Sequence, residues 1–162
     1  MLYEDVFGWL ERVGARYVVV GGVALVLHGY ERPTNDLDLV FDCAGDGAER
    51  ATRALYAAGF FPTVPLGLAE VTVWRTLDAR GRRVDAFARF HVPFAELLAG
   101  SARVRVGEQL VRVASVADLV RAKRLAGRPA DLEDLERLLS NTRADDTDAK
   151  PAAQDTHEGD AV

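Results

Sequence analysis

Several features that define common protein classes are missing from this sequence of 162 residues. The single cysteine, Cys43, excludes an internal disulfide, and no histidine or second cysteine clusters near it to form a zinc site. We expect Cys43 to be a small, buried thiol at a strand end. No apolar run approaches the roughly 20 residues needed to span a bilayer, and residues 1–20 lack the basic start and apolar centre of a signal peptide. We therefore expect a cytoplasmic protein without a membrane partner.

The C-terminal stretch lacks apolar residues. Within residues 141–162 the one large apolar side chain is Val162, and six Asp or Glu face two Lys or Arg. Burial of so little apolar surface does not offset the entropy lost on ordering. Over the whole chain the apolar fraction is 49%, which is enough for a packed core. We expect one domain over residues 1–140 and an acidic, disordered tail over residues 141–162.

The most informative stretch begins with a predicted strand, turn and helix. The β-branched run Val18–Val20 stops at Gly21 and Gly22, and the apolar residues 23–27 that follow favour a buried helix. Two adjacent glycines let the backbone adopt conformations closed to other residues and let an anionic group approach it. Because unpaired N–H groups at a helix start also attract anions, the turn is a candidate phosphate-binding site.

A predicted strand carrying two carboxylates follows this helix. Within residues 34–41, Asp36 and Asp38 share one face, while Leu37 and Leu39 point to the other. Two carboxylates this close repel each other, so such a pair is normally stabilised by a cation. Mg²⁺ prefers hard oxygen ligands and usually takes one or two protein carboxylates together with water and phosphate oxygens. The pair is therefore a candidate metal site.

The order and spacing of these motifs resemble a known signature. A Gly-Gly pair followed, after residues 23–35, by Asp-Leu-Asp-Leu resembles the DNA polymerase beta-like nucleotidyltransferase superfamily. With His28-Gly29 and the Arg-x-Thr motif between them, the stretch is similar to the small bacterial toxin-like branch that includes AbiE-type and MenT-type nucleotidyltransferases. The resemblance implies a nucleotidyltransferase fold, an NTP such as ATP as substrate, and Mg²⁺ or Mn²⁺ as cofactor. It also implies nucleotide binding by Gly21, Gly22, Arg32 and Thr34.

A third carboxylate lies in a predicted β-hairpin. The runs 71–77 and 82–87 flank a four-residue turn, a pattern typical of hairpins. Asp85, in the second run, is either a polar-face residue without a role or converges with Asp36 and Asp38 across the sheet. The resemblance implies the second alternative, because a carboxylate on a later strand completes the metal site of that superfamily.

A predicted helical pair closes the motif series. Ser115 caps a helix that ends near Ala126, and a second helix runs from Pro129 through Leu139. A lysine, an arginine and an aspartate in this region look like the closing motif of the AbiE/MenT branch, in which the lysine contacts the nucleotide and the aspartate orients it or the acceptor. Alternatively, the lysine is a solvated helix residue and the aspartate a first-turn acid favoured by the helix dipole. The residues concerned are Lys123, Arg128 and Asp131.

The remaining pattern predicts the fold class. Amphipathic helices are expected at 2–14 and 46–58, a short helix at 94–99 and a second hairpin at 103–113. Strands and helices in this order favour an α+β fold, close to α/β, in which helices pack on a small mixed β-sheet and a helical pair follows.

The charge distribution leaves the acceptor open. Residues 75–128 carry twelve Lys or Arg against five Asp or Glu, although the whole chain has a net charge of −5. A local basic face is compatible with a polyanionic partner. We expect a metal-dependent nucleotidyltransferase, with tRNA or another RNA favoured as acceptor, that is the toxin of a toxin–antitoxin pair with an antitoxin protein as partner. The alternatives are a catalytically silent nucleotide- or partner-binding module, or an enzyme that modifies a protein or a small molecule.

Overall fold

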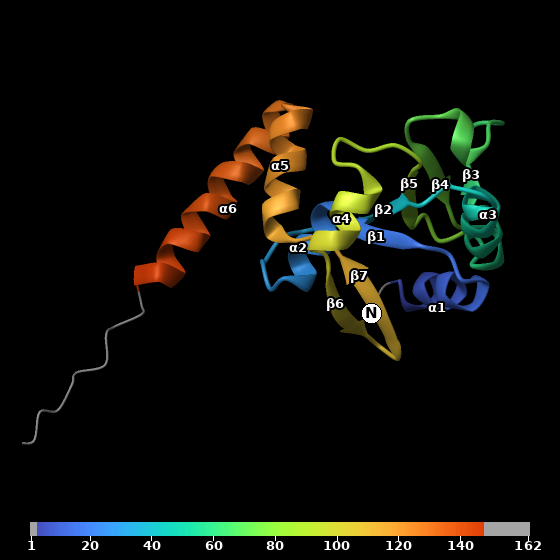
Figure 1. Cartoon of the computed structure of the whole chain (residues 1–162), viewed down its shortest axis with the longest axis horizontal. Helices are drawn as coiled ribbons and strands as arrows, with labels where there is room; N and C mark the ends of the chain where they lie inside the picture. The colour runs from blue at the N-terminus through green and yellow to red at the C-terminus, as the bar shows by residue number, and fades with distance from the viewer. Residues whose placement is uncertain (1–2, 148–162) are drawn as a thin grey trace, which may run out of the picture.

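Seven strands form one mixed sheet through the middle of the molecule (Figure 1). The computed structural model describes residues 3–147, with side chains as far as Ser140. The strand order is β3-β4-β5-β2-β1-β7-β6, in which β2 is parallel to β5 and β1 is parallel to β7, while the other neighbours are antiparallel. The strands are β1 (Tyr17–Val20), β2 (Asp36–Phe41), β3 (Phe61–Pro62), β4 (Trp74–Leu77), β5 (Arg83–Phe87), β6 (Ala102–Val106) and β7 (Gln109–Val113).

Helices pack around this sheet, and α5 and α6 form a pair at one side of it (Figure 1). The predicted fold class is confirmed, including the helical pair after the sheet. The helices are α1 (Glu4–Val13), α2 (Gly21–Leu27), α3 (Gly47–Ala57), the 3-10 turn η1 (Leu68–Glu70), α4 (Phe94–Gly100), α5 (Val116–Ala126) and α6 (Pro129–Thr147).

The last helix is longer than the sequence predicted. It continues to Thr147, past the expected end at Leu139. Residues 148–162 lie outside the described part of the chain, so the expected disordered tail and the domain boundary at residue 140 stay predictions. No helix among the described residues is long and apolar enough to cross a membrane.

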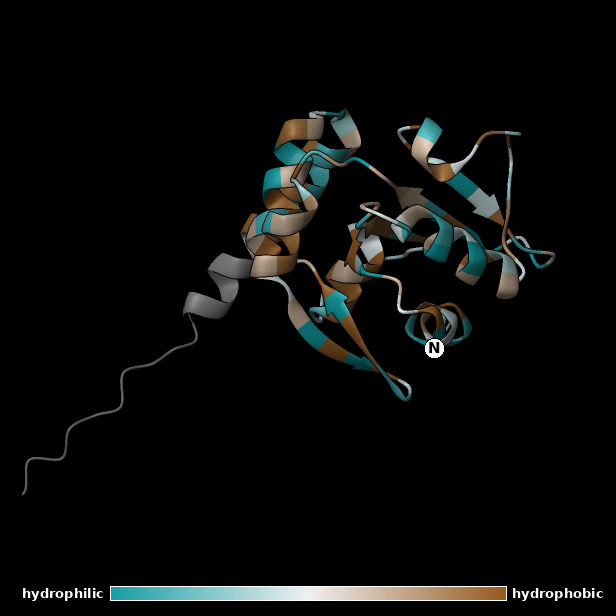
Figure 2. Ribbon diagram, turned by 45° about the vertical axis from the view of Figure 1, so that its right-hand side comes forward, coloured by the Kyte–Doolittle hydropathy of each residue, from teal (hydrophilic) through white to brown (hydrophobic). Residues whose placement is uncertain are grey.

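Alternation along the central strands separates a core face from a polar face. Leu37 and Leu39 of β2 are fully buried, and Val84 and Ala86 are level with them on β5. Trp74 pairs with Ala86 and contacts the ring of Tyr56 on α3, so α3 covers this core face. The apolar sides of strands and helices meet across the layer between them (Figure 2). The carboxylates of β2 and β5 consequently lie on the opposite face.

The lone cysteine follows β2, as expected, but is only half-buried. Burial and the neighbouring Asp42 carboxylate raise the pKa of the Cys43 thiol. A thiol with a raised pKa is a poor nucleophile at neutral pH. This agrees with a packing role for Cys43.

Candidate active site

The three predicted carboxylates are brought together by strand pairing. Asp38 of β2 is directly level with Asp85 of β5, and Asp36 is level with Arg83. Because residues paired across neighbouring strands share a face, Asp36, Asp38 and Asp85 all project from the same side of the sheet. Asp85 is 5% exposed. The structure therefore places it with Asp36 and Asp38, and not on an unrelated polar face.

The two glycines that begin α2 leave room for one of these carboxylates. Gly21 has a φ of +67°, and a Cβ built there would lie 2.1 Å from Oδ2 of Asp38. Any other residue would be strained at that φ and would collide with the carboxylate. Gly22 lets the loop before β2 pack closely against α2, because a Cβ on Gly22 would lie 2.8 Å from Oγ1 of Thr34 and 3.5 Å from Nε of Arg32. Four residues predicted to bind nucleotide, Gly21, Gly22, Arg32 and Thr34, therefore lie together at the start of α2.

The environment of the central carboxylate, Asp38, disfavours its ionised form. Burial first, then the charges of Asp85 and Asp36, raise the pKa of Asp38 to about 7. No hydrogen bond or ion pair within residues 3–140 reaches Asp38. Holding it ionised at neutral pH therefore needs additional positive charge.

Arginines neutralise the two outer carboxylates. Arg75 on β4 donates from Nε and Nη2 to the two oxygens of Asp85, at 3.1 and 3.2 Å. Arg83 donates to Asp36, while its buried Nε lies 3.6 Å from Asp85 and has no hydrogen-bond partner. Each arginine thus forms its hydrogen-bonded ion pair with one of the two carboxylates that flank Asp38.

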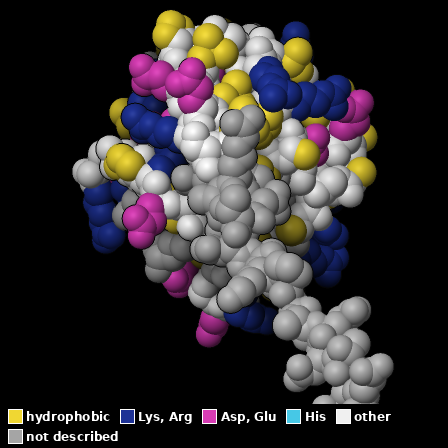
Figure 3. All heavy atoms as spheres, turned by 90° about the vertical axis from the view of Figure 1, so that its left-hand side faces the viewer, with side chains coloured by type: hydrophobic (Ala, Val, Ile, Leu, Met, Phe, Trp, Pro, Cys, Tyr) yellow, Lys and Arg dark blue, Asp and Glu magenta, His cyan; other side chains and the backbone are white. Residues whose placement is uncertain are grey.

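A second set of charges closes the site from the α5–α6 side. Lys123 of α5 donates to Asp134 of α6 at 2.8 Å and lies 3.7 Å from Asp131. Arg32, from the loop after α2, donates to the same Asp134 carboxylate at 2.7 Å, and Arg128 donates to Asp131 at 2.7 Å. On this side of the molecule, Lys and Arg side chains lie beside Asp and Glu (Figure 3). The predicted residues Arg32, Lys123, Arg128 and Asp131 therefore form one chain of ion pairs.

The hub of this chain, Asp134, is the residue that sequence reasoning missed. Burial opposes its ionisation, but hydrogen bonds from Lys123 and Arg32 outweigh that effect and lower the pKa of Asp134. A signal was present, since Asp134 lies one helical turn after Asp131 and so faces the same side of α6. Its partner Arg32 is 102 residues away in sequence, which pattern reasoning does not connect.

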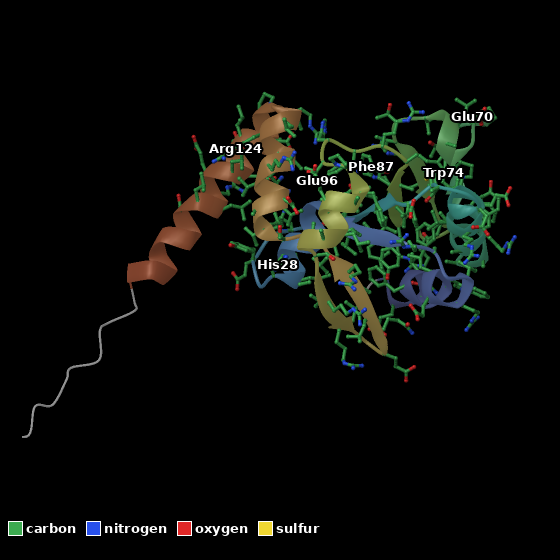
Figure 4. All side chains as sticks on the ribbon, in the orientation of Figure 1. His28, Glu70, Trp74, Phe87, Glu96 and Arg124 are labelled. Carbon is green, nitrogen blue, oxygen red and sulfur yellow. The ribbon has the colours of Figure 1, made fainter. Side chains whose placement is uncertain are left out.

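A cleft of about 840 Å³ opens above these groups. This volume is in the range of sites that hold small ligands. Asp38, Asp85, Gly21 and Gly22 form its floor, and the α5–α6 pair contributes one wall. The other wall carries Thr72, Val73, Arg75, Phe87, Arg89, Phe90 and His91. Phe87 lies at the end of β5 between the sheet and α4 (Figure 4).

Two polar residues near these groups lie outside the cleft. Arg82, next to Arg83, turns away and binds Asp5 and Asp78, so it fixes the hairpin to α1. His28, at the end of α2, bonds through Nε2 to the carbonyl of Ala114 at 2.7 Å (Figure 4). Its ring therefore joins α2 to the segment between β7 and α5 and does not contact the carboxylates.

Solved structures share this architecture. A candidate nucleotidyltransferase of Thermotoga maritima, TM1012, superposes with a TM-score of 0.62 at 18% identity, covering 86% of this chain and 91% of that chain. The chain has a nucleotidyltransferase fold. The lincosamide antibiotic adenylyltransferase LnuA gives 0.60 at 15% identity over 83% of this chain and 92% of its own. The antibiotic-resistance factor ANT(2'')-Ia gives 0.53 at 14% identity over 90% and 93%. The sequence matches no family model and no curated protein.

The donor set of this nucleotidyltransferase fold suits a hard divalent cation, but it is not preassembled. Among the described residues, no three His, Cys, Asp or Glu side chains are grouped so that they hold a metal ion as they stand. The three carboxylates nevertheless supply only oxygen donors, and burial, followed by the charges of Asp85 and Asp36, raises the pKa of Asp38, so a cation bound there would favour its ionised form. Asp36, Asp38 and Asp85 therefore fit Mg²⁺ or Mn²⁺ once Arg75 and Arg83 give way.

We predict that Asp38→Asn stabilises the metal-free protein above pH 7. The folded state raises the pKa of Asp38 from 3.8 to about 7, so it binds the proton more tightly than the unfolded chain does. The wild type therefore loses stability as pH rises from about 4 to 7, by roughly 2–4 kcal/mol, and the uncharged variant does not. Urea denaturation in EDTA between pH 5 and 8.5 measures the difference. A gap between the two proteins that does not grow with pH would contradict this account.

We also predict that Arg75→Gln tightens metal binding. The variant removes the cation that is paired with Asp85, and a half-exposed ion pair is worth up to about 1 kcal/mol, so the Kd for Mn²⁺ should fall by up to about fivefold. Calorimetric titration with Mn²⁺ in the absence of nucleotide measures it. Arg89→Gln is the matched control, because Arg89 lines the same cleft but contacts the carbonyl of Ala69 at 3.4 Å, not a carboxylate. Equal shifts in both variants would mean that Arg75 acts only through its overall charge.

Proposed function

We propose that this protein is a Mg²⁺- or Mn²⁺-dependent nucleotidyltransferase that moves a nucleotidyl group from an NTP to a hydroxyl of an acceptor. One observation carries the proposal: Asp38 and Asp85 are level on adjacent parallel strands, with Asp36 on the same face, beneath a glycine turn that admits a carboxylate. The fold supports it, because the similar solved structures include adenylyltransferases.

Each group in the cleft has a role in this proposal. Asp38 and Asp85 in the cleft, with Asp36 beside them on β2, would hold the metal, which would neutralise charge on the triphosphate when bound. The acceptor oxygen attacks the α-phosphorus, pyrophosphate leaves, and Asp85 helps to remove the hydroxyl proton. Positioning and charge neutralisation account for the rate, and no covalent intermediate with the protein is required.

The nucleotide side of the cleft is the wall that carries the ion-pair chain. Lys123 and Arg32 supply positive charge for phosphate oxygens, and Arg128 adds a third cation. Asp131 and Asp134 orient these cations while no nucleotide is bound. The backbone at Gly21 and Gly22 lets the phosphates come close.

We favour RNA, with tRNA as the first candidate, as the acceptor. The wall opposite the α5–α6 pair carries two arginines and three aromatic rings, in which Phe90 lies 5.2 Å from Phe87 and 5.5 Å from His91 between ring centroids. Aromatic faces stack on bases and arginines bind phosphates, whereas the arginines repel a polycationic small molecule. An RNA acceptor agrees with the sequence resemblance to toxin-like nucleotidyltransferases, and with the protein acting as a toxin that an antitoxin restrains.

A small-molecule acceptor is the second candidate. Two of the similar structures are of an antibiotic adenylyltransferase and an antibiotic-resistance factor, and the chain has the same fold as both. The exposed apolar side chain of Val73 at the mouth of the cleft would suit an uncharged ring system. A transfer reaction with a labelled NTP distinguishes the two candidates, because the label enters either RNA or a small molecule.

We predict that α-labelled NTPs mark RNA when the wild-type protein, Mg²⁺ and total RNA are combined, and that EDTA stops the reaction. Asp38→Asn should reduce transfer by at least about a hundredfold, because the loss of a direct metal ligand exceeds the 10- to 100-fold effects of outer partners. Parallel reactions with total protein and with lincosamide and aminoglycoside antibiotics test the other acceptors.

Asp46→Asn is the control, because Asp46 is an exposed carboxylate at α3, paired with Arg50 and away from the cleft. Transfer by Asp38→Asn at the level of this control would end the enzymatic proposal. Label in a small molecule and not in RNA would replace the favoured acceptor with the second candidate.

A further inference from the structure

The hairpin formed by β6 and β7 carries unusually placed arginines. Arg103 of β6 pairs directly with Arg112 of β7, and Arg105 lies two residues along β6. Because cross-strand partners share a face and alternate residues repeat it, all three project from the same side of the hairpin. Arg103 and Arg105 are exposed, and Arg112 is half-buried.

This arginine face is on the active-site side of the sheet. Val113 of β7 is level with Val19 of β1, and Val19 is level with Leu39 of β2, so these three share the core face. Arg112 precedes Val113 and therefore projects from the opposite face, which is the face of Asp38. Strands are about 4.8 Å apart, so β7 and β6 place the arginines roughly 10–20 Å from Asp38.

None of these arginines has an anionic partner within residues 3–140. Within residues 3–140 the guanidinium groups of Arg103, Arg105 and Arg112 make no hydrogen bond or ion pair with a described side chain or carbonyl, in contrast to those of Arg32, Arg75 and Arg83. Like charges placed directly opposite each other on neighbouring strands destabilise the pair. A hairpin that keeps two opposed arginines without a counter-charge is suited to an external anion.

We propose that the arginine face of the β6–β7 hairpin binds the phosphate backbone of the RNA acceptor, beyond the nucleotide that enters the cleft. This inference rests on the proposed function and adds a binding surface outside the cleft. Phosphate contacts from arginines on a strand fix the position and register of a nucleic acid without reading its sequence. The hairpin therefore aligns the acceptor, and the cleft selects the hydroxyl.

The connection between hairpin and cleft is fixed by hydrogen bonds. Ala114, which follows β7, donates its N–H to the carbonyl of Val19 at 3.0 Å and accepts the bond from the ring of His28. Val19 lies two residues before Gly21, and His28 closes α2. A polyanion held on the hairpin is thus held in a constant position relative to Asp38.

Charge complementarity favours RNA over an acidic protein segment. Within the hairpin face the side chain opposite Arg105 is Leu110, which is 51% exposed. Regularly spaced phosphates match arginines that repeat along a strand, and the exposed leucine offers an apolar contact for a ribose or base. An acidic segment would use the same charges but gains nothing from alignment with the cleft.

The test compares tRNA binding by wild type and by Arg103→Gln/Arg105→Gln, both in the full chain. The double variant should bind total tRNA roughly tenfold more weakly at low salt. Its slope of log affinity against log salt should be smaller by about 1.4–1.8, since the variant loses two phosphate contacts and each contributes about 0.7–0.9. Binding of Mg²⁺–NTP, measured by calorimetry, should not change.

The matched control is Arg12→Gln/Arg53→Gln, which removes two exposed arginines from α1 and α3. If both double variants lose the same affinity, the effect is one of net charge and the hairpin assignment is overturned. If the wild type labels RNA but the hairpin variant binds tRNA normally, the assignment fails while the proposed function stands. If the wild type binds poly-glutamate as tightly as tRNA, with the same loss in the hairpin variant, the face binds an acidic protein segment and RNA docking is overturned.

Discussion

The mutual repulsion of three carboxylates is the constraint on which the rest of the site depends. Strand pairing sets Asp38 level with Asp85, and alternation sets Asp36 on the same face, so folding itself brings the charges together. The buried leucines between them fix this register, because a slip by one residue would exchange the carboxylate face with the core face. The apolar core therefore provides the free energy that holds like charges close, and the cost is seen in the raised pKa of Asp38.

The cations around this site follow from that repulsion. Arg75 and Arg83 reduce it at the outer carboxylates, and the cations of the α5–α6 wall are in turn paired with acids of α6. Most charges in the cleft thus have a charged partner, and the exceptions within the described residues are Asp38 and Arg89, which no ion pair reaches. A triphosphate with its metal brings both signs of charge at once, so it can exchange partners with both sets without leaving a buried charge unpaired. Neither ion alone offers that compensation.

Local patterns predicted the fold well because its elements are short and strongly signalled. The alternation of leucine and aspartate on β2 and the two hairpins depend on neighbours within a few residues, and the structure has them, although β4 begins at Trp74 and not at residue 71 and α2 already begins at Gly21. Convergence of Asp85 needed the resemblance, since a strand pattern does not name its neighbour in a sheet. Asp134 was missed because its importance comes from a contact with Arg32 across the fold. The close approach of the Asp38 side chain to Gly21 was likewise not named by the local pattern, because it depends on the pairing of β1 with β2.

The cleft and the hairpin use arginine in physically different ways. In the cleft, binding a new anion to Arg75 or Arg32 first requires breaking an existing ion pair, so the net gain is the difference between two interactions. On the hairpin, Arg103 and Arg105 lose only water and counterions, and bound phosphate also relieves the repulsion between opposed arginines. Affinity for a polyanion should therefore come mainly from the hairpin. The cleft should discriminate between ligands, because only a ligand that pairs with both its cations and its carboxylates makes up for the ion pairs that binding breaks. In the proposed function, affinity and discrimination are thus properties of two separate surfaces of the same sheet.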